Sequence, residues 1–255
     1  MIAACGGVDP DVPPPDADPG PDPSIEGTPV ETFETTACST DTVLPLSIQI
    51  ADEVNCLMPG QLVTFEEGNG IVFAGSAVLP YLGDDARTDL LAAVAAKPGT
   101  DLEITSGFRT VVQQYLLRRW FELGRCGITA AAEPGRSNHE TGRALDISNF
   151  SAWISTFAAH GWDHSVPGDP VHFDHLASPD IRGADIVAFQ RLWNRNAPDD
   201  QIAEDGAYGA MTADRLARAP AEGFGIGAIC GAARMAPVVM PAVEIPSDRS
   251  TECAD

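Results

Sequence analysis

Apolar and polar positions between residues 84 and 123 follow helical spacing in two stretches and strand spacing between them. Residues 84–96 carry apolar side chains on one helical face, and the stretch Lys97-Pro98-Gly99 would end that helix. Residues 102–106 alternate, which predicts a strand. Residues 111–123 predict a second helix with Thr110 as its N-cap. The side chains expected to form the two apolar faces are Leu90, Leu91, Val94, Val112, Tyr115, Leu116, Trp120 and Leu123.

Shorter apolar runs predict further elements around this core. Residues 62–65 and 71–73 flank a polar, glycine-containing stretch and predict a short hairpin. Residues 143–147 and 171–173 are expected to be strands, and residues 151–159 a helix between them. Helices mixed with a mostly antiparallel sheet indicate an α+β fold.

The pattern divides the chain into four parts. Residues 1–36 are rich in Pro and Asp, cannot bury apolar surface, and are expected to form an extended linker. Residues 37–178 hold the α+β domain. Residues 180–220 predict a small all-α domain, and residues 221–255, rich in Gly, Ala and Pro, receive no role.

The segment 180–220 predicts two helices joined through a turn at 205–209. Thr212 is expected to cap the second helix, which runs through Leu216. The first helix is amphipathic, and its apolar residues are Ile186, Val187, Phe189, Leu192 and Trp193.

The charge balance narrows the classes of partner. The 255 residues include 37 Asp and Glu against 15 Lys and Arg, for a formal net charge of −22. An acidic surplus repels phosphates, which argues against nucleic acid or an anionic membrane surface as a partner. No run approaches the roughly 18 apolar residues that cross a bilayer. We expect a monomer.

The six cysteines favour disulfides over a thiolate metal site, because none lies in a CxxC pair. Scattered cysteines of this kind are typical of proteins outside the cytosol. Cys38 and Cys56 predict a local bridge, although the sequence leaves the connectivity open. The stretch Ile2-Ala3-Ala4-Cys5-Gly6 resembles a bacterial lipobox, so a lipid anchor at Cys5 is expected; the alternative is a chance cysteine. The expected location is the bacterial envelope, periplasmic or extracellular.

The candidate chemistry lies between His139 and His172. Two imidazoles and a carboxylate, here His139, His172 and Asp146, are a common ligand set for catalytic zinc, with the fourth position left to water. Asp169, shortly before His172, could act as the base, and Arg109 could hold a peptide carboxylate or an oxyanion. Each residue alone has an ordinary alternative as a packed histidine, a capping aspartate or a solvated arginine; their joint pattern favours a site.

This pattern resembles the zinc D-alanyl-D-alanine carboxypeptidase family, which also contains vancomycin-resistance D,D-dipeptidases and phage L-alanyl-D-glutamate endopeptidases. The resemblance covers roughly residues 100–176 and rests on SxHxxGxAxD, on a following [DE]xxH, and on S-x-[FY]-R-[ST] with nearby glutamines. The matching residues are Ser106, Phe108, Arg109, Thr110, Gln113, Gln114, Ser137, His139, Gly142, Ala144, Asp146, Asp169 and His172.

The resemblance implies zinc held by His139, Asp146 and His172, with Asp169 as base and Arg109 in substrate binding. It also makes Ser137 and Gln114 candidates for substrate binding, with a turn-forming role as the alternative for Ser137. One position departs from the pattern: the carboxypeptidases usually carry Glu where Asp169 stands, and Asp occurs in some endopeptidase relatives. The shorter side chain leaves the bond that is cleaved open.

Residues from about 183 to 219 resemble the small helical peptidoglycan-binding domain. The resemblance rests on the stretch 205–212, which begins Asp205-Gly206-Ala207-Tyr208-Gly209, and on the preceding Phe189-Gln190-Arg191-Leu192. A simple turn is the alternative. A wall-binding module would raise the local concentration of a wall hydrolase at its substrate.

Together these features predict a zinc peptidase, secreted or lipid-anchored, that acts on peptidoglycan stem peptides. The favoured reaction is removal of the terminal D-alanine, and the second candidate is endopeptidase cleavage within the stem. The alternative outside the enzymes is a non-catalytic wall-binding protein. Asp169, the candidate acid–base residue, argues against this alternative, because a purely structural zinc site needs no base. A nickel or copper site is disfavoured because a carboxylate with two imidazoles suits zinc.

Overall fold

The computed structural model describes residues 25–230, so the predictions for Cys5, for most of the linker and for residues 231–255 lie outside the described range. No helix of residues 25–230 is long and apolar enough to cross a membrane. In chain order the helices are α1 (Phe33–Thr36), α2 (Leu44–Leu57), α3 (Asp84–Ala96), α4 (Val111–Glu122), α5 (Ile154–Ala158), α6 (Ala184–Asn196) and α7 (Ala210–Arg218). The strands are β1 (Val63–Thr64), β2 (Ile71–Phe73), β3 (Tyr81–Leu82), β4 (Leu102–Ser106), β5 (Ala144–Ile147) and β6 (His172–Asp174).

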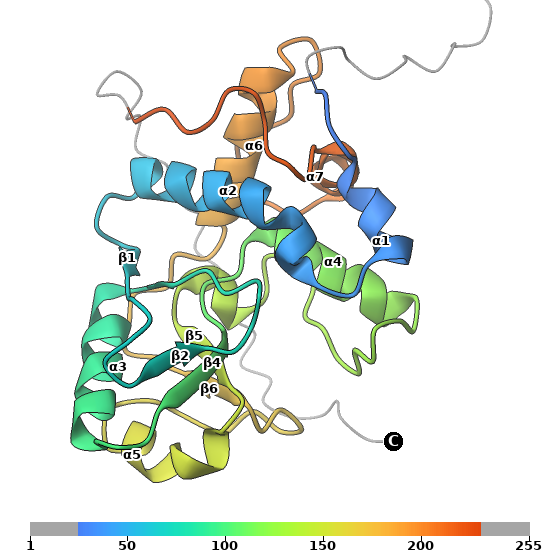
Figure 1. Ribbon diagram of the computed structural model, residues 1–255. Coiled ribbons are helices and arrows are strands. Elements are labelled where there is room, and N and C mark those ends of the chain that lie inside the picture. Colours follow the sequence, from blue (N-terminus) through green and yellow to red (C-terminus); the bar gives the residue numbers. More distant parts are fainter. Residues whose placement is uncertain (1–24, 231–255) are drawn as a thin grey trace, which may run out of the picture.

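The main sheet has the order β2-β4-β5-β6, with β2 parallel to β4 and the other neighbours antiparallel. Figure 1 shows α3 and α5 beside this sheet, and α1, α2, α4, α6 and α7 gathered on the other side of the molecule. The described residues thus form an α+β fold.

The predicted hairpin of residues 62–65 and 71–73 is wrong. β1 pairs with β3, whereas β2 joins β4 in the main sheet. The reason is local: Gly68 and Ile71 exchange both of their backbone hydrogen bonds, at 2.8 and 3.0 Å. This tight turn redirects the chain, and the carbonyl of Gly70 then accepts from the N–H of Leu102 at 2.8 Å.

One hydrophobic cluster lies between the sheet, α3 and α5. Leu145, Ile147 and Phe173 point into it from alternate strand positions. Leu91, predicted on the buried face of α3, is instead 43% exposed. The helix expected over 151–159 is divided into a 3-10 turn, Phe150–Ala152, and α5, and the fully buried Trp153 lies between them.

α4 follows the sequence prediction closely. Thr110 and Gln113 form a capping box at its start, and Tyr115, Leu116 and Trp120 are buried. Leu123 lies beyond the end of α4 and is 44% exposed.

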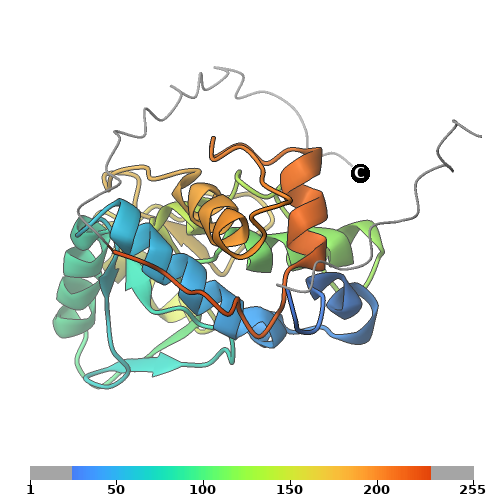
Figure 2. The same ribbon diagram turned by 90° about the horizontal axis from the view of Figure 1, so that it is seen from above.

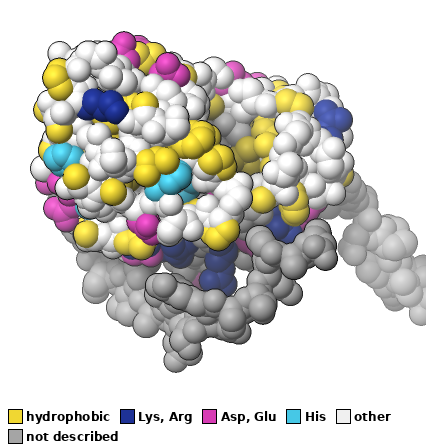
Figure 3. Space-filling view, turned by 90° about the horizontal axis from the view of Figure 1, so that it is seen from below, with side chains coloured by type: hydrophobic (Ala, Val, Ile, Leu, Met, Phe, Trp, Pro, Cys, Tyr) yellow, Lys and Arg dark blue, Asp and Glu magenta, His cyan; other side chains and the backbone are white. Residues whose placement is uncertain are grey.

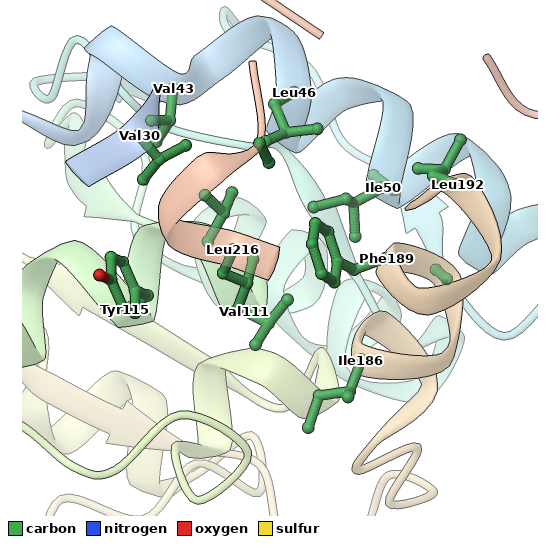
Figure 4. Packing of buried hydrophobic residues seen from close by; sticks show 14 of the residues in the cluster. Val30, Val43, Leu46, Ile50, Val111, Tyr115, Ile186, Phe189, Leu192 and Leu216 are labelled. Carbon is green, nitrogen blue, oxygen red and sulfur yellow. The ribbon is translucent and has the colours of Figure 1, made fainter. Parts of the chain in front are cut away.

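A second cluster joins helices from both ends of the chain. α2 and α6 lie side by side, as two perpendicular views show (Figures 1 and 2). Figure 4 shows Ile50, Phe189 and Leu216 meeting Val111 in one apolar core. The peptidoglycan-binding role and the domain division predicted for residues 180–220 stay predictions.

Polar contacts reinforce this helical packing. Arg195 of α6 donates to both carboxylate oxygens of the buried Glu53 on α2, at 3.1 and 3.0 Å. The prediction that Thr212 caps a helix is wrong, because α7 begins at Ala210. Thr212 is buried inside α7, and its hydroxyl donates to the carbonyl of Ala207 at 3.1 Å.

Two disulfides cross-link the described residues, Cys38–Cys126 and Cys56–Cys230. The predicted Cys38–Cys56 bridge is therefore wrong. Cys56 lies near the far end of α2, a helix of 14 residues, which carries it away from Cys38. Disulfides of this kind are typical of an oxidising compartment.

Candidate metal centre

The register of two antiparallel strands sets Asp146 beside His172. The two residues are directly opposed partners in β5 and β6. Their neighbours Leu145 and Phe173 form the next pair and point into the hydrophobic cluster. Because side chains alternate along a strand, Asp146 and His172 share the opposite face of the sheet.

A short capped turn presents His139 to the same face. The 3-10 helix Asn138–Thr141 begins after Ser137, whose hydroxyl accepts from the N–H of His139 at 3.3 Å. The Glu140 side chain accepts from the N–H of Ser137 at 3.0 Å and completes the capping box. Gly142 ends the turn at φ 71°, a left-handed conformation that glycine adopts without strain.

Three ligand atoms converge where these elements meet. Asp146 Oδ1 lies 3.1 Å from His139 Nε2 and 3.0 Å from His172 Nδ1. The two nitrogens are 3.2 Å apart. The described residues thus contain a group of two imidazoles and one carboxylate that could hold a metal ion.

The other ring nitrogens are held by groups that accept hydrogen bonds. His139 Nδ1 donates to the carbonyl of Gly107 at 2.8 Å, and His172 Nε2 donates to Asp174 Oδ1 at 3.0 Å. When both imidazoles are neutral, these contacts leave the lone pairs of His139 Nε2 and His172 Nδ1 facing Asp146. Two lone pairs and a carboxylate in contact favour a cation between them, and such outer contacts are the usual support of metal-binding histidines. The donor set therefore fits zinc.

The pKa shifts of the metal-free cluster also favour binding of a cation. Burial lowers the pKa of His139, and the charge of Arg109 adds to the shift. Burial opposes ionisation of Asp146, but hydrogen bonds and charge from the imidazoles and Arg109 outweigh it and hold its pKa well below the usual value. Burial also lowers the pKa of His172, but Asp146 and Asp174 outweigh it and raise that pKa to about 9. At neutral pH the metal-free His172 therefore keeps a proton, which a bound metal ion would displace.

Arg109 lies directly against this cluster. Its Nη2 donates to Asp146 Oδ2 at 3.1 Å and to Ser106 Oγ at 3.2 Å, and its Nη1 donates to Gln114 Oε1 at 3.1 Å. The backbone N–H of Arg109 also donates to the carbonyl of His139 at 3.2 Å. The guanidinium is 17% exposed, so it reaches the site from a largely buried position.

Two predicted substrate-binding residues lie behind the site. Gln114 is buried, with Oε1 accepting from Arg109 and Nε2 donating to the carbonyl of Ala132 at 2.8 Å. Ser137 is buried as the cap of the His139 turn. These contacts support Gln114 as a residue that positions Arg109, and they favour the turn-forming alternative for Ser137.

Asp169 lies in the loop that leads into β6. Its backbone N–H donates to the carbonyl of Val166 at 3.3 Å, and its carbonyl accepts from the N–H of His172 at 3.4 Å. His164 Nε2 donates to the carbonyl of Pro170 at 2.7 Å and holds the loop. The half-buried Asp169 carboxylate makes no hydrogen bond or ion pair within residues 25–230.

Asp174 and Asn138 were not predicted from the sequence, yet both lie beside the cluster. Asp174 is buried, and its Oδ1 accepts from both His172 Nε2 and the Asn138 amide, each at 3.0 Å. The His-x-Asp spacing within a strand could have indicated it, because residues two apart share a face.

One face of the molecule carries hydrophobic side chains around an imidazole. In the view from below, acidic groups of the described residues are visible mainly toward the edge of this face (Figure 3).

Comparison with known families adds an independent finding. Residues 84–165 match the family model described as VanY, D-alanyl-D-alanine carboxypeptidase. The match covers less than half of the chain; it includes Arg109, His139 and Asp146 and ends before Asp169 and His172. No curated protein matches the chain. The matched residues carry two of the three converging side chains, so the part of the chain that resembles the D-alanyl-D-alanine carboxypeptidase family includes His139 and Asp146.

Proposed function

We propose that the protein is a zinc-dependent D-alanyl-D-alanine carboxypeptidase that trims peptidoglycan stem peptides. The observation that carries the proposal is the convergence of His139 Nε2, Asp146 Oδ1 and His172 Nδ1 in a chain whose residues 84–165 match the D-alanyl-D-alanine carboxypeptidase model. Zinc bound there would lower the pKa of a water molecule to near neutrality and polarise the scissile carbonyl.

Asp169 is the proposed general base. It precedes His172 in the loop, and its carboxylate is free of hydrogen bonds from residues 25–230. Asp174, the other carboxylate beside His172, accepts from the nitrogen that faces away from the convergence point and is also bound by Asn138. Asp174 is therefore unsuited to take a proton from water, whereas Asp169 can accept one and return it to the leaving amine.

Arg109 is proposed to bind the substrate. It places a fixed positive charge beside Asp146, where the C-terminal carboxylate of a stem peptide or the oxyanion of the tetrahedral intermediate would gain a charge-assisted hydrogen bond. Ser106 and Gln114 hold the guanidinium from two sides, so little reorganisation is needed when substrate binds.

Endopeptidase cleavage within the stem is the second candidate. The observation that favours it is the Asp at position 169, one methylene shorter than the Glu usual in the carboxypeptidases. Both activities place the protein at the peptidoglycan, and the two disulfides agree with a location in the envelope or outside the cell.

The test uses a synthetic stem pentapeptide that ends in D-Ala-D-Ala. Zinc-loaded protein should release one D-alanine, seen by mass spectrometry, and a chelator or the His139→Ala substitution should abolish the release. A cut between L-Ala and the D-Glu position would assign the endopeptidase instead. No cleavage by folded, zinc-bound protein would refute the enzyme and favour a wall-binding protein.

A further inference from the structure

A chain of side-chain contacts leads away from His172 across the molecule. His172 Nε2 donates to Asp174 Oδ1, which also accepts from Asn138 Nδ2, each at 3.0 Å. The carbonyl oxygen of the Asn138 side chain accepts from Arg182 Nη2 at 2.8 Å. Each donor meets an acceptor, so Asn138 is fixed in one orientation between a carboxylate and a guanidinium.

Each member of this chain is held in place. Asp174 is buried, and its backbone exchanges hydrogen bonds with Asp163 at 2.7 and 2.9 Å. Arg182 stands just before α6, and its side chain is 18% exposed. Asp180 accepts from the N–H of Arg182 at 2.9 Å and contacts its guanidinium at 3.5 Å, which anchors the arginine at the entry to α6.

The contact chain therefore begins just before α6 and ends at His172 Nε2, the ring nitrogen opposite the Nδ1 that faces the convergence point. Arg182 lies beyond residue 178, outside the region predicted to hold the catalytic domain. Asn138 supplies the link, because it opens the 3-10 turn that also carries His139. Asn138 thus adjoins both histidines: His139 follows it in the turn, and His172 contacts it through Asp174.

We propose that Asp174 is a positioning residue that fixes the tautomer and ring orientation of His172, and that Arg182, through Asn138, holds Asp174 in place. This inference rests on the proposed zinc site and deepens it: the affinity for metal is set partly by the segment that leads into α6. Residues that support a metal-binding histidine in this way change metal affinity by about 10–100-fold when they are substituted.

Zinc affinity of the full-length protein tests the proposal. Metal-stripped wild type, Asp174→Ala, Asp174→Asn and Arg182→Ala are titrated with zinc against a competing chelator, and thermal unfolding of the metal-free proteins checks the fold. Asp174→Ala should bind about 10–100-fold more weakly. Asp174→Asn, which keeps an acceptor for His172 Nε2, should recover part of that loss, and Arg182→Ala should weaken binding by less than Asp174→Ala.

Arg191→Ala is the matched control. Arg191 lies on α6 with a side chain 20% exposed and pairs with Glu53 and Glu204, so its loss removes two ion pairs without touching the contact chain. Its zinc affinity should equal that of the wild type. The visible spectrum of the cobalt-loaded protein should change in Asp174→Ala and stay unchanged in Arg191→Ala, because the spectrum reports ligand geometry.

Two failures are distinguishable. Wild-type affinity in Asp174→Ala, or equal weakening in Arg182→Ala and Arg191→Ala, would overturn the inference and leave the zinc site standing. A folded wild type that binds no zinc would overturn the proposed function and the inference with it.

Discussion

Replacing Asp169 with Asn should separate the chemistry from metal binding and folding. The substitution keeps the shape of the side chain and the two backbone hydrogen bonds of the loop, at 3.3 and 3.4 Å. The carboxylate makes no hydrogen bond or ion pair within the described part of the chain, so we expect the free energy of unfolding to change by no more than about 0.5 kcal/mol. Zinc affinity should also stay unchanged, because the three converging ligand atoms belong to other residues.

Turnover should fall steeply in the same variant. Loss of a general base costs about 10²–10⁴ in rate. At 1.36 kcal/mol for each factor of ten, this is about 3–5 kcal/mol of activation free energy. The assay is D-alanine release from the stem pentapeptide, with the zinc content of each sample measured alongside, and His139→Ala as the variant that loses both metal and activity. Full zinc content with unchanged kcat in Asp169→Asn would remove this residue from the mechanism, and loss of zinc would refute its assignment as a base alone.

Three further predictions concern stability. Gly142→Ala should lower the free energy of unfolding, measured with denaturant, by more than Gly99→Ala does. Both glycines have positive φ, which costs alanine about 1–2 kcal/mol, but only at Gly142 would the new Cβ lie 2.6 Å from a neighbouring side chain. Equal losses in the two variants would contradict this reasoning. Asp185 is fully buried, and its carboxylate oxygens have no hydrogen-bond partner among residues 25–230. Burial raises the pKa of this carboxyl well above the usual value, so the folded state binds more protons than the unfolded state. The contribution of Asp185 to the free energy of unfolding therefore falls as pH rises above about 4. Asp185→Asn should therefore raise the free energy of unfolding more at about pH 8 than at about pH 5, and an equal gain at both would refute the assignment. Joint replacement of Cys56 and Cys230 by Ser should lower the free energy of unfolding by about 2–5 kcal/mol, because that disulfide joins residues 174 positions apart. An unchanged melting temperature would show that the disulfide does not stabilise the fold.

The site could be predicted from the sequence because its information is local. Asp146 sits in an alternating strand whose apolar neighbours face a core, so its side chain must face the other way. Ser137, Glu140 and Gly142 specify the turn that carries His139. The spacing of such motifs predicts chemistry even before the strands are placed.

The contacts that could not be predicted from the sequence join residues far apart in the chain. β2 pairs with β4 across the whole of α3, and Cys56 pairs with Cys230 at the other end of the described chain, so neither partner could be found by spacing. The support of His172 by Asp174 needed the strand register.

The helical segment shows the same limit. The amphipathic pattern of α6 predicts a buried face but not its partner, which is α2 from the opposite end of the sequence. Glu53 and Arg195 form an ion pair across that interface, and neither shows in the sequence as more than an ordinary surface charge.

In the proposed function, a metal held by His139, Asp146 and His172 drives hydrolysis of the stem peptide. The most direct test adds zinc stepwise to metal-stripped protein and follows release of D-alanine from the stem pentapeptide. Activity should rise with zinc and reach its plateau at one zinc per chain. Activity that is independent of zinc, or no release from either end of the peptide at full occupancy, would contradict it.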